Sequence, residues 1–344
     1  GFKINSTSGD VNTSGANYIY LAIRRPDGLV GKPPDAGTDV FTTVAGSSSI
    51  PYFNSGFTVD FGQAKNPTGS GEWYTSARLI QGKRLNTAST AAEGNMDTLG
   101  WDQSTAWGST DWSGYNAFMW KRHAGFDVQA YVGTGANQTI AHSLGITPQM
   151  IWIKNRTRNI NGSSEAHWKV WQESLTSGSY SNIPNTNNFM ELNRTEGVGT
   201  GSIFNSTAPT SSVVSLGASG TNGDVKHNLN GDEYLMVLFA SVAGICKVGT
   251  YAGNGGTKTV TTGFAPRYVM LKAIAGAAWS NWYVYDTTRG IPASGTVNYL
   301  MLNKENAEEG GDDIIDVSST GFTLNVSWDS HNGSSYSYLY YAHA

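Results

Sequence analysis

The stretch KTVTTGFAPRYVMLK at residues 258–272 shows the pattern from which the fold can be predicted, and QTIAHSLGITPQMIWIK at 138–154 repeats it. In both stretches a proline precedes the final lysine by six residues. The residues between them, YVML and MIWI, are apolar runs of strand length, bounded by a proline start and a lysine end. The two stretches therefore predict equivalent buried β-strands in a repeated unit.

Further matches extend the repeat in both directions. Upstream, YVGTG and YAGNG place glycine where a hairpin turn needs positive φ. Downstream, HWKVW and NWYVY predict an aromatic strand, and period-2 alternation places Trp168 with Val170, or Trp282 with Val284, on one face. A Leu-Asn step and a long apolar closing strand follow in each unit. The matched ranges are 131–135 with 251–255, 167–171 with 281–285, 190–193 with 300–303, and 234–240 with 338–344.

A more diverged copy comes earlier in the chain. In it, Phe57 precedes Lys65 by eight residues, as Phe264 precedes Lys272. EWYTSA takes the place of the aromatic strand, KRLN that of the Leu-Asn step, and YNAFMW that of the closing strand. These three segments are residues 72–77, 83–86 and 115–120.

The repeat predicts three β-modules in tandem, at residues 26–125, 126–244 and 245–344. Short strands, hairpin glycines and the near absence of 3.6-residue periodicity indicate an all-β fold. Each module has the size of a small two-sheet sandwich. We therefore expect lectin-like β-sandwich or jelly-roll modules, with a brief helical turn near 304–309.

The segment GFKINSTSGDVNTSGANYIYLAI at residues 1–23 aligns without a gap to residues 321–343. Residues 1–25 therefore read as the closing strand or strands of a preceding or permuted module, with YIYLAI (18–23) as the strand. A lone strand exposes its backbone polar groups and needs a partner. Three partners stay open: the final module, a module upstream, or a neighbouring subunit.

Composition excludes several functional classes. The net charge of −4 and the scattered Lys and Arg argue against nucleic-acid binding. No apolar run reaches 18 residues, so membrane insertion is not expected. Cys246 is the single cysteine, which excludes an intramolecular disulfide or a cysteine-rich metal site and predicts a buried strand residue. The chain suits folding in a reducing cytoplasm.

Motifs for catalysis or metal binding are weak. The six histidines stand at no metal-ligand spacing. EEGGDDIID at 308–316 reads as a solvated acidic loop, with Ca²⁺ binding as the alternative. Asp286 and Arg289 read as a turn-capping carboxylate with a surface arginine, since the second module has Gln172 and Leu175 instead. We therefore predict no catalytic residue, no metal and no cofactor.

One aromatic loop is the candidate binding site. WDQSTAWGSTDW at 101–112 sets Trp101, Trp107 and Trp112 among Asp, Ser and Gly, a composition suited to stacking on a host-surface glycan. The alternative is that these indoles close the end of the sandwich, because tryptophan is usually largely buried.

A family resemblance rests on YIYLAIRRP (18–26), VGTYAGNGGTKTV (248–260), GFAPRYVMLK (263–272), WYVYDTTRG (282–290) and the closing GFTLN with SYSYLYYAHA. This combination resembles a repeated module of large tail-fibre-like virion proteins of marine tailed phages, including those that infect cyanobacteria. The resemblance is strong over 245–344 and 1–26, partial over 126–244 and weak over 27–125.

The resemblance implies a structural virion protein, as a tail fibre, spike or decoration subunit, and no enzyme. Its expected partners are other virion proteins and copies of itself, a trimer among them, on a particle assembled in the host cytoplasm. The alternatives are a carbohydrate-binding adhesin and a polysaccharide-degrading spike enzyme. The enzyme would need two carboxylates facing one cleft.

Overall fold

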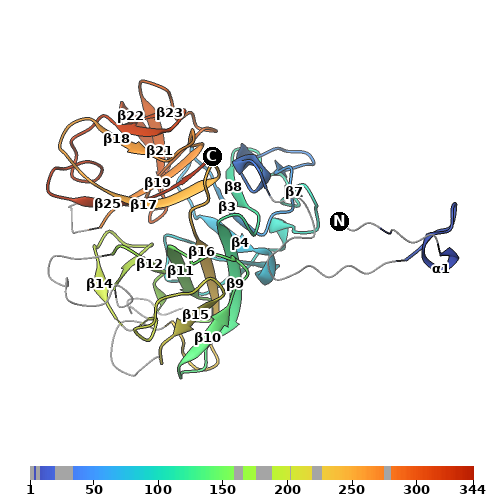
Figure 1. The fold of residues 1–344 in the computed structure, drawn as a ribbon. Coiled ribbons are helices and arrows are strands. Elements are labelled where there is room, and N and C mark those ends of the chain that lie inside the picture. The colour runs from blue at the N-terminus through green and yellow to red at the C-terminus, as the bar shows by residue number, and fades with distance from the viewer. Residues whose placement is uncertain are drawn as a thin grey trace.

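A computed structural model describes residues 4, 8–19, 34–158, 166–175, 188–201, 203–218, 227–274 and 280–344. Strands dominate these residues, and they pair in antiparallel sheets. The all-β, sandwich-like fold predicted from the sequence is confirmed. Three sets of strands follow one another along the chain and form three lobes (Figure 1). We call them module 1 (41–120), module 2 (126–239) and module 3 (246–343).

All three modules share one strand order in their larger sheet. The first strand of the module lies at one edge, the closing strand lies beside it, and the strand that carries the lysine (Lys65, Lys154 or Lys272) comes third, next to the aromatic strand. The closing strand therefore pairs on both sides, which buries its backbone hydrogen bonds within the sheet.

Module 1 has the shortest large sheet. Its order is β1 (Phe41–Ala45), β8 (Asn116–Trp120), β3 (Phe61–Lys65) and β4 (Tyr74–Ala77). Two small ribbons accompany it, β2 (Phe53–Asn54) with β7 (Ala106–Trp107) and β5 (Lys83–Arg84) with β6 (Gly94–Asn95). Its 3₁₀ turns are η1 (Gly37–Asp39), η2 (Arg78–Ile80) and η3 (Asp97–Leu99).

Module 2 has a six-stranded sheet and a two-stranded one. The large sheet runs β14 (Gly199–Thr200), β13 (Asn188–Glu191), β12 (Lys169–Gln172), β11 (Met150–Asn155), β16 (Glu233–Phe239) and β9 (Phe126–Val132). The small sheet pairs β10 (Gln138–Ala141) with β15 (Val213–Leu216).

Module 3 repeats this plan with a larger second sheet. Its large sheet runs β17 (Cys246–Ala252), β25 (Ser337–His343), β19 (Tyr268–Ala273), β20 (Tyr283–Asp286), β21 (Val297–Met301) and β22 (Glu309–Asp312). Its small sheet runs β18 (Lys258–Thr261), β24 (Gly321–Leu324) and β23 (Ile315–Ser318).

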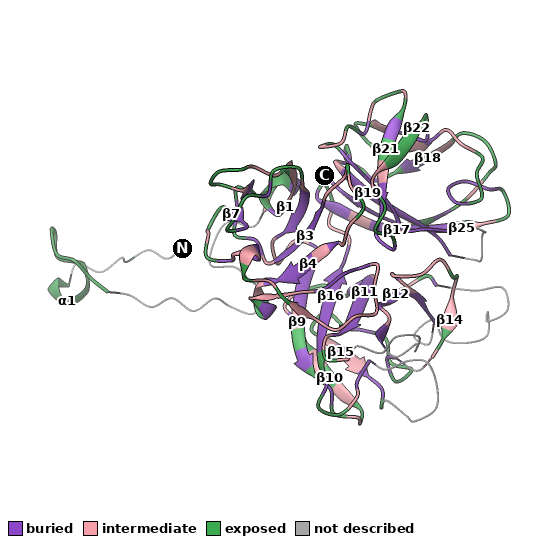
Figure 2. Ribbon diagram, turned by 180° about the vertical axis from the view of Figure 1, so that it is seen from behind, coloured by how far each residue is buried: buried purple, intermediate pink, exposed green. Residues whose placement is uncertain are grey.

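Each large sheet has two buried faces. One face packs against the small sheet of its own module and forms an outer core, as Val269 and Leu271 of β19 do with Phe322 of β24. The other face enters a single cluster with members from all three modules, which we call the shared core. Figure 2 shows the strands that surround it as buried.

Aromatic rings join the modules in pairs across the shared core. Trp120 of module 1 stacks on Phe126 of module 2, with ring centroids 5.9 Å apart. Phe239 of module 2 meets Tyr341 of module 3 at 4.9 Å, and Phe41 of module 1 meets Tyr268 of module 3 at 5.4 Å. Rings in such contacts contribute beyond their buried area.

Two expectations differ from the structure. Residues 304–308 form no helical turn, because this extended loop offers its backbone carbonyls to module 1. The strand expected at 18–23 is not seen at Tyr18 and Ile19, and residues 20–23 lie outside the described part of the chain. The described residues before it contain a short helix, α1 (Gly9–Asn12). The closing position of module 3, between β17 and β19, is occupied by β25.

Candidate functional site at the module interfaces

Three lysines lie at or next to the last residue of the equivalent strands β3, β11 and β19, and all three are buried. Because side chains alternate along a strand, each lysine points to the same face as the shared-core residue four positions before it, which is Phe61, Met150 or Tyr268. In β11 and β19 the residue two positions before, Trp152 or Met270, also belongs to the shared core. Their aliphatic stems therefore run through apolar surroundings, and each ammonium group must find acceptors at the far end.

Each lysine donates to a backbone carbonyl of a different module. Lys65 Nζ of module 1 bonds Glu305 O of module 3 at 3.1 Å. Lys154 Nζ of module 2 bonds Thr90 O of module 1 at 3.0 Å, and Lys272 Nζ of module 3 bonds Thr195 O of module 2 at 2.9 Å. The donors thus point in one direction around the three modules, from 1 to 3, from 3 to 2 and from 2 to 1.

The tryptophans before the aromatic strands follow the same direction. Trp73 Nε1 of module 1 donates to Met301 O of module 3 at 3.0 Å. Trp168 Nε1 of module 2 donates to Asn86 O of module 1 at 2.9 Å. Trp282 Nε1 completes the circle by donating to Glu191 O of module 2 at 3.0 Å.

A third hydrogen bond recurs in the opposite sense. The carbonyl two residues after each lysine accepts a backbone N–H from the neighbouring module. The pairs are Glu308 N to Pro67 O at 2.7 Å, Glu93 N to Arg156 O at 2.8 Å, and Val198 N to Ile274 O at 3.2 Å. In module 1 the lysine acceptor Thr90 and the N–H donor Glu93 each lie two residues further from the Leu-Asn step than the equivalent residues do in modules 2 and 3.

The Leu-Asn step positions the acceptor loop in every module. The asparagine side chain accepts the backbone N–H of the tryptophan in its own module, as Asn303 Oδ1 does from Trp282 N at 2.9 Å and Asn193 Oδ1 does from Trp168 N at 3.0 Å. The asparagine therefore fixes the position of the tryptophan, which donates to one neighbouring module. It also begins the loop whose carbonyls accept hydrogen bonds from the other neighbouring module.

The interfaces form a closed ring. Every module presents a donor set on one side and an acceptor set on the other, so the contacts are heterologous, and a rotation of three such units closes. The ring is pseudo-threefold because the three copies differ in sequence. Since it is made within one chain, its closure needs no assembly of separate subunits.

Burial shifts the electrostatics of the ring. Desolvation lowers the pKa of Lys154 and of Lys272 to about 7, and it lowers the pKa of Lys65. Each lysine also has an acceptor in its own module, such as Ala166 O at 2.8 Å from Lys154 Nζ. These amines are therefore hydrogen-bonded and shielded from solvent, and their bonds hold neighbouring modules together.

The pair Asp286 and Arg289 belongs to the contact between modules 1 and 3. Arg289 Nε donates to Asp286 Oδ2 at 2.7 Å, and Thr43 of module 1 donates to Asp286 Oδ1 at 3.4 Å. The carboxylate caps the turn as predicted, since it accepts Arg289 N at 3.0 Å. The expectation of a surface arginine was wrong, because the side chain of Arg289 is only 4% exposed.

The predicted glycan site is corrected by the structure. Trp101, Trp107 and Trp112 lie in the outer core of module 1, at 3%, 0% and 3% exposure. Trp107 packs against Trp101 at 5.4 Å and against Phe53 at 5.7 Å between ring centroids. The loop folds under the sheet because these indoles supply apolar area that the short sheet of module 1 needs. They present no open ring face to a sugar.

A recurring histidine-asparagine pair was missed by the sequence analysis. His331 is buried between Tyr285 Oη, 2.6 Å from Nε2, and Ser330 Oγ, 2.7 Å from Nδ1. Burial lowers its pKa to about 3. Its backbone carbonyl accepts Tyr251 Oη at 2.6 Å, as the carbonyl of His227 accepts Tyr131 Oη at 2.6 Å. The signal was present as His-Asn seven residues before the tyrosine of the closing strand, in both modules.

The remaining candidates of the sequence analysis are structural. Cys246 is buried, and desolvation raises the pKa of its thiol to about 12. The acidic stretch 308–316 is exposed in part but is not the loop that was predicted, because Glu309–Asp312 form β22 and Ile315–Ser318 form β23. Asn325 Nδ2 donates to Asp313 Oδ1 at 2.8 Å and to Asp316 Oδ2 at 2.7 Å. Within the described ranges, no group of three or more His, Cys, Asp or Glu could hold a metal ion.

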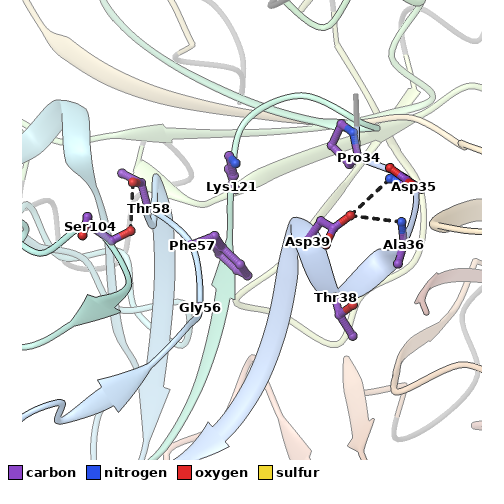
Figure 3. Close-up of a pocket in the computed structure, with 10 residues that line it drawn as sticks. All are labelled: Pro34, Asp35, Ala36, Thr38, Asp39, Gly56, Phe57, Thr58, Ser104 and Lys121. Atoms are coloured by element: carbon purple, nitrogen blue, oxygen red, sulfur yellow. Dashed lines mark hydrogen bonds between the residues drawn. The ribbon is translucent and has the colours of Figure 1, made fainter. Parts of the chain in front are cut away.

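A hollow lies at one end of module 1, beside η1 (Figure 3). Its volume is about 690 Å³, and its lining includes Asp35, Asp39, Phe57 and Lys121. The carboxylate of Asp39 accepts the backbone N–H groups of Asp35 and Ala36, each at 3.2 Å. This carboxylate therefore shapes the loop that borders the hollow.

The ring and the two-sheet modules define a class of protein, a multi-module all-β protein whose polar contacts join its own parts. A family model described as a domain of unknown function, DUF7483, matches residues 81–344. The chain therefore belongs to the DUF7483 family. The match begins between β4 and β5 and includes all of modules 2 and 3. No curated protein matches the chain in sequence. Among the described residues, no helix has the length and apolar character needed to cross a membrane.

Proposed function

We propose that this chain is a non-catalytic structural protein of a tailed-phage particle, acting as a tail fibre, spike or decoration subunit. The similarity of its repeat to tail-fibre-like virion modules supports the place on the particle. Its expected partners are other virion proteins and further copies of itself, and its location is the extracellular particle after assembly in the host cytoplasm.

The observation that carries the structural role is the closed ring. Buried lysine and tryptophan donors, which in an enzyme could serve a substrate, are used here to bind backbone carbonyls of the next module. A body in which each sheet is buried on both faces is stiff, because close-packed interiors resist deformation. Stiffness and contact are what a particle component requires.

The two alternative functions have less support. The adhesin interpretation depended on Trp101, Trp107 and Trp112, which are buried. The enzyme interpretation needs two carboxylates free to act in one cleft, whereas Asp39 in the hollow beside η1 is held by two backbone N–H groups. We therefore favour the structural role.

The test is made on intact particles of the phage that encodes the chain. Particles are purified on a density gradient, their peptides are identified by mass spectrometry, and an antibody raised against the chain is located by electron microscopy. We expect the chain in fixed ratio to other virion proteins and label at one defined place. A chain present in the lysate but absent from intact particles would overturn the proposal.

A further inference from the structure

The described residues near the N-terminus contain a turn that also precedes the closing strand of module 3. Tyr18 Oη donates to Gly9 O at 2.9 Å and accepts Thr13 N at 2.7 Å. In module 3, Tyr338 Oη donates to Asp329 O at 2.7 Å and accepts Gly333 N at 2.8 Å. Tyrosine and both of its partners are offset by 320 residues in each case, as the gap-free sequence alignment requires.

Module 2 has the same turn. Leu229 N donates to Tyr234 Oη at 2.9 Å, which corresponds to the bond from Thr13 N to Tyr18 Oη. Gly231 of module 2 has φ +80°, and Gly15, at the same place in the turn, has φ +78°. Only glycine adopts such a φ readily. The N-terminal turn thus has the local structure of a module although α1 lies away from all three modules in Figure 1.

The apolar side chains of this segment are exposed where those of module 3 are buried. Ile4 and Tyr18 are 43% and 41% exposed, while their counterparts Leu324 and Tyr338 are fully buried. Ile19 is fully exposed, and its counterpart Leu339 lies in the shared core. The segment thus exposes the apolar side chains that module 3 buries at the equivalent positions.

The three modules offer no place for this segment. In each, the position between the first strand and the lysine strand is filled by the module's own closing strand, β8, β16 or β25. In modules 2 and 3, Asn228 and Asn332 also fix the first hairpin loop, by accepting Thr134 N at 2.9 Å and Asn254 N at 3.0 Å. Asn12 stands at the corresponding position of the N-terminal turn.

We propose that the N-terminal segment, in its described residues Ile4 and Ser8–Ile19, is a closing segment that docks into a further β-module of this same kind. That module would present strands equivalent to β17 and β19 with the space between them open. Tyr18 would stack inside its outer core, as Tyr338 does on Tyr251 with centroids 4.9 Å apart, and Ile19 would enter the opposite face. The antiparallel strand addition would satisfy the backbone on both sides.

The test exchanges closing segments within the full chain. Residues 331–344 are replaced by residues 11–24, which preserves the length and places Tyr18 and Ile19 at positions 338 and 339. We expect a folded chain with one melting transition. Ile19→Asp in this graft buries a charge and is expected to lower the melting temperature by several degrees or abolish folding.

Two matched variants make the result specific. Tyr18→Phe in the graft and Tyr338→Phe in the parent chain remove the same two hydrogen bonds, so we expect melting temperatures to fall by similar amounts.

Replacing 331–344 by residues 227–240 of module 2 shows how well module 3 accepts a known closing segment. The proposal is overturned if the graft and its Ile19→Asp variant behave alike, whether both fold or neither does. This outcome is independent of where the protein resides on a particle.

Discussion

At the scale of residues, the lysine and tryptophan donors explain how polar groups can sit inside a largely apolar junction. A buried donor without an acceptor costs more than the bond itself contributes. Here the backbone carbonyls of a neighbouring module accept from each tryptophan Nε1 and supply each lysine with an acceptor in addition to the one in its own module, so the donors are fully satisfied only beside that neighbour. The bonds therefore give the interfaces specificity in addition to apolar burial.

Trp282→Phe tests one such bond. The change removes the donor to Glu191 O and part of a buried ring, so we expect the free energy of unfolding to fall by about 1–3 kcal/mol in urea denaturation. Trp328→Phe is the matched control, since Trp328 is 41% exposed, and it should change stability by less than about 0.5 kcal/mol. Equal effects of the two substitutions would contradict the role given to Trp282.

The lowered lysine pKa values predict a dependence on pH. Lys154 and Lys272 have pKa values of about 7 in the folded chain against about 10.5 when unfolded. Between these values the unfolded chain binds more protons, so stability should rise as the pH increases from 7 toward 10. Buried tyrosines, such as Tyr340 with its pKa raised to about 12, should reverse the trend above pH 10. Melting temperatures measured between pH 7 and pH 11 test both the rise in stability and the fall above pH 10.

Lys272→Met provides the control for the alkaline profile. Methionine fills a similar volume and does not titrate, so the rise in melting temperature between pH 7 and 10 should become smaller. A profile that Lys272→Met leaves unchanged would mean that this lysine titrates as it does in the unfolded chain.

At the scale of elements, the sequence shows why the lysine strands need cover on both faces. MIWI and YVML have apolar side chains in every position, and a strand exposed on one face would alternate. The position and type of these strands could therefore be predicted. Which element covers the second face could not, because a local pattern carries no information about a surface far away in the chain.

The loop of Trp101, Trp107 and Trp112 is an element whose burial could not be predicted from its sequence. Its Gly, Ser and Asp residues are typical of a surface turn, and this composition favoured an exposed site. The burial of the three indoles follows from the short sheets of module 1, where β2 and β7 have two residues each. How much apolar surface a loop must add to complete the core depends on the lengths of the strands, and these were not known from the sequence.

The hairpin glycines allow a sharp test at the same scale. A Cβ at Gly253 would lie 2.2 Å from Gly333 O in the backbone of the turn before β25. Gly253→Ala must displace that turn and should reduce stability by about 1–3 kcal/mol. Gly256→Ala nearby would meet no atom closer than 3.9 Å and should be tolerated. Similar melting temperatures for both variants would show that the turn can move at little cost.

At the scale of the whole molecule, the shared core makes the three modules one unit of folding. Its members come from every module, so no module can unfold without exposing apolar surface of the other two. We expect a single calorimetric transition with equal van't Hoff and calorimetric enthalpies. Trp168→Phe, at the interface of modules 1 and 2, should shift this transition without splitting it. Two or more separate peaks would show that the modules are independent.

Ring closure was beyond prediction from the sequence for a related reason. The alignment of the copies indicated equal folds, but equal folds are compatible with a linear array or a ring. The recurring Lys and Trp positions acquire their meaning only when donors and acceptors are seen to belong to different copies.

Closure also sets a limit on growth. A circle of three has no vacant junction, so a fourth copy cannot enter it. Any further copy or partner must attach through a surface outside the three junctions, and growth of such a protein therefore cannot reuse the contacts that hold its own modules together.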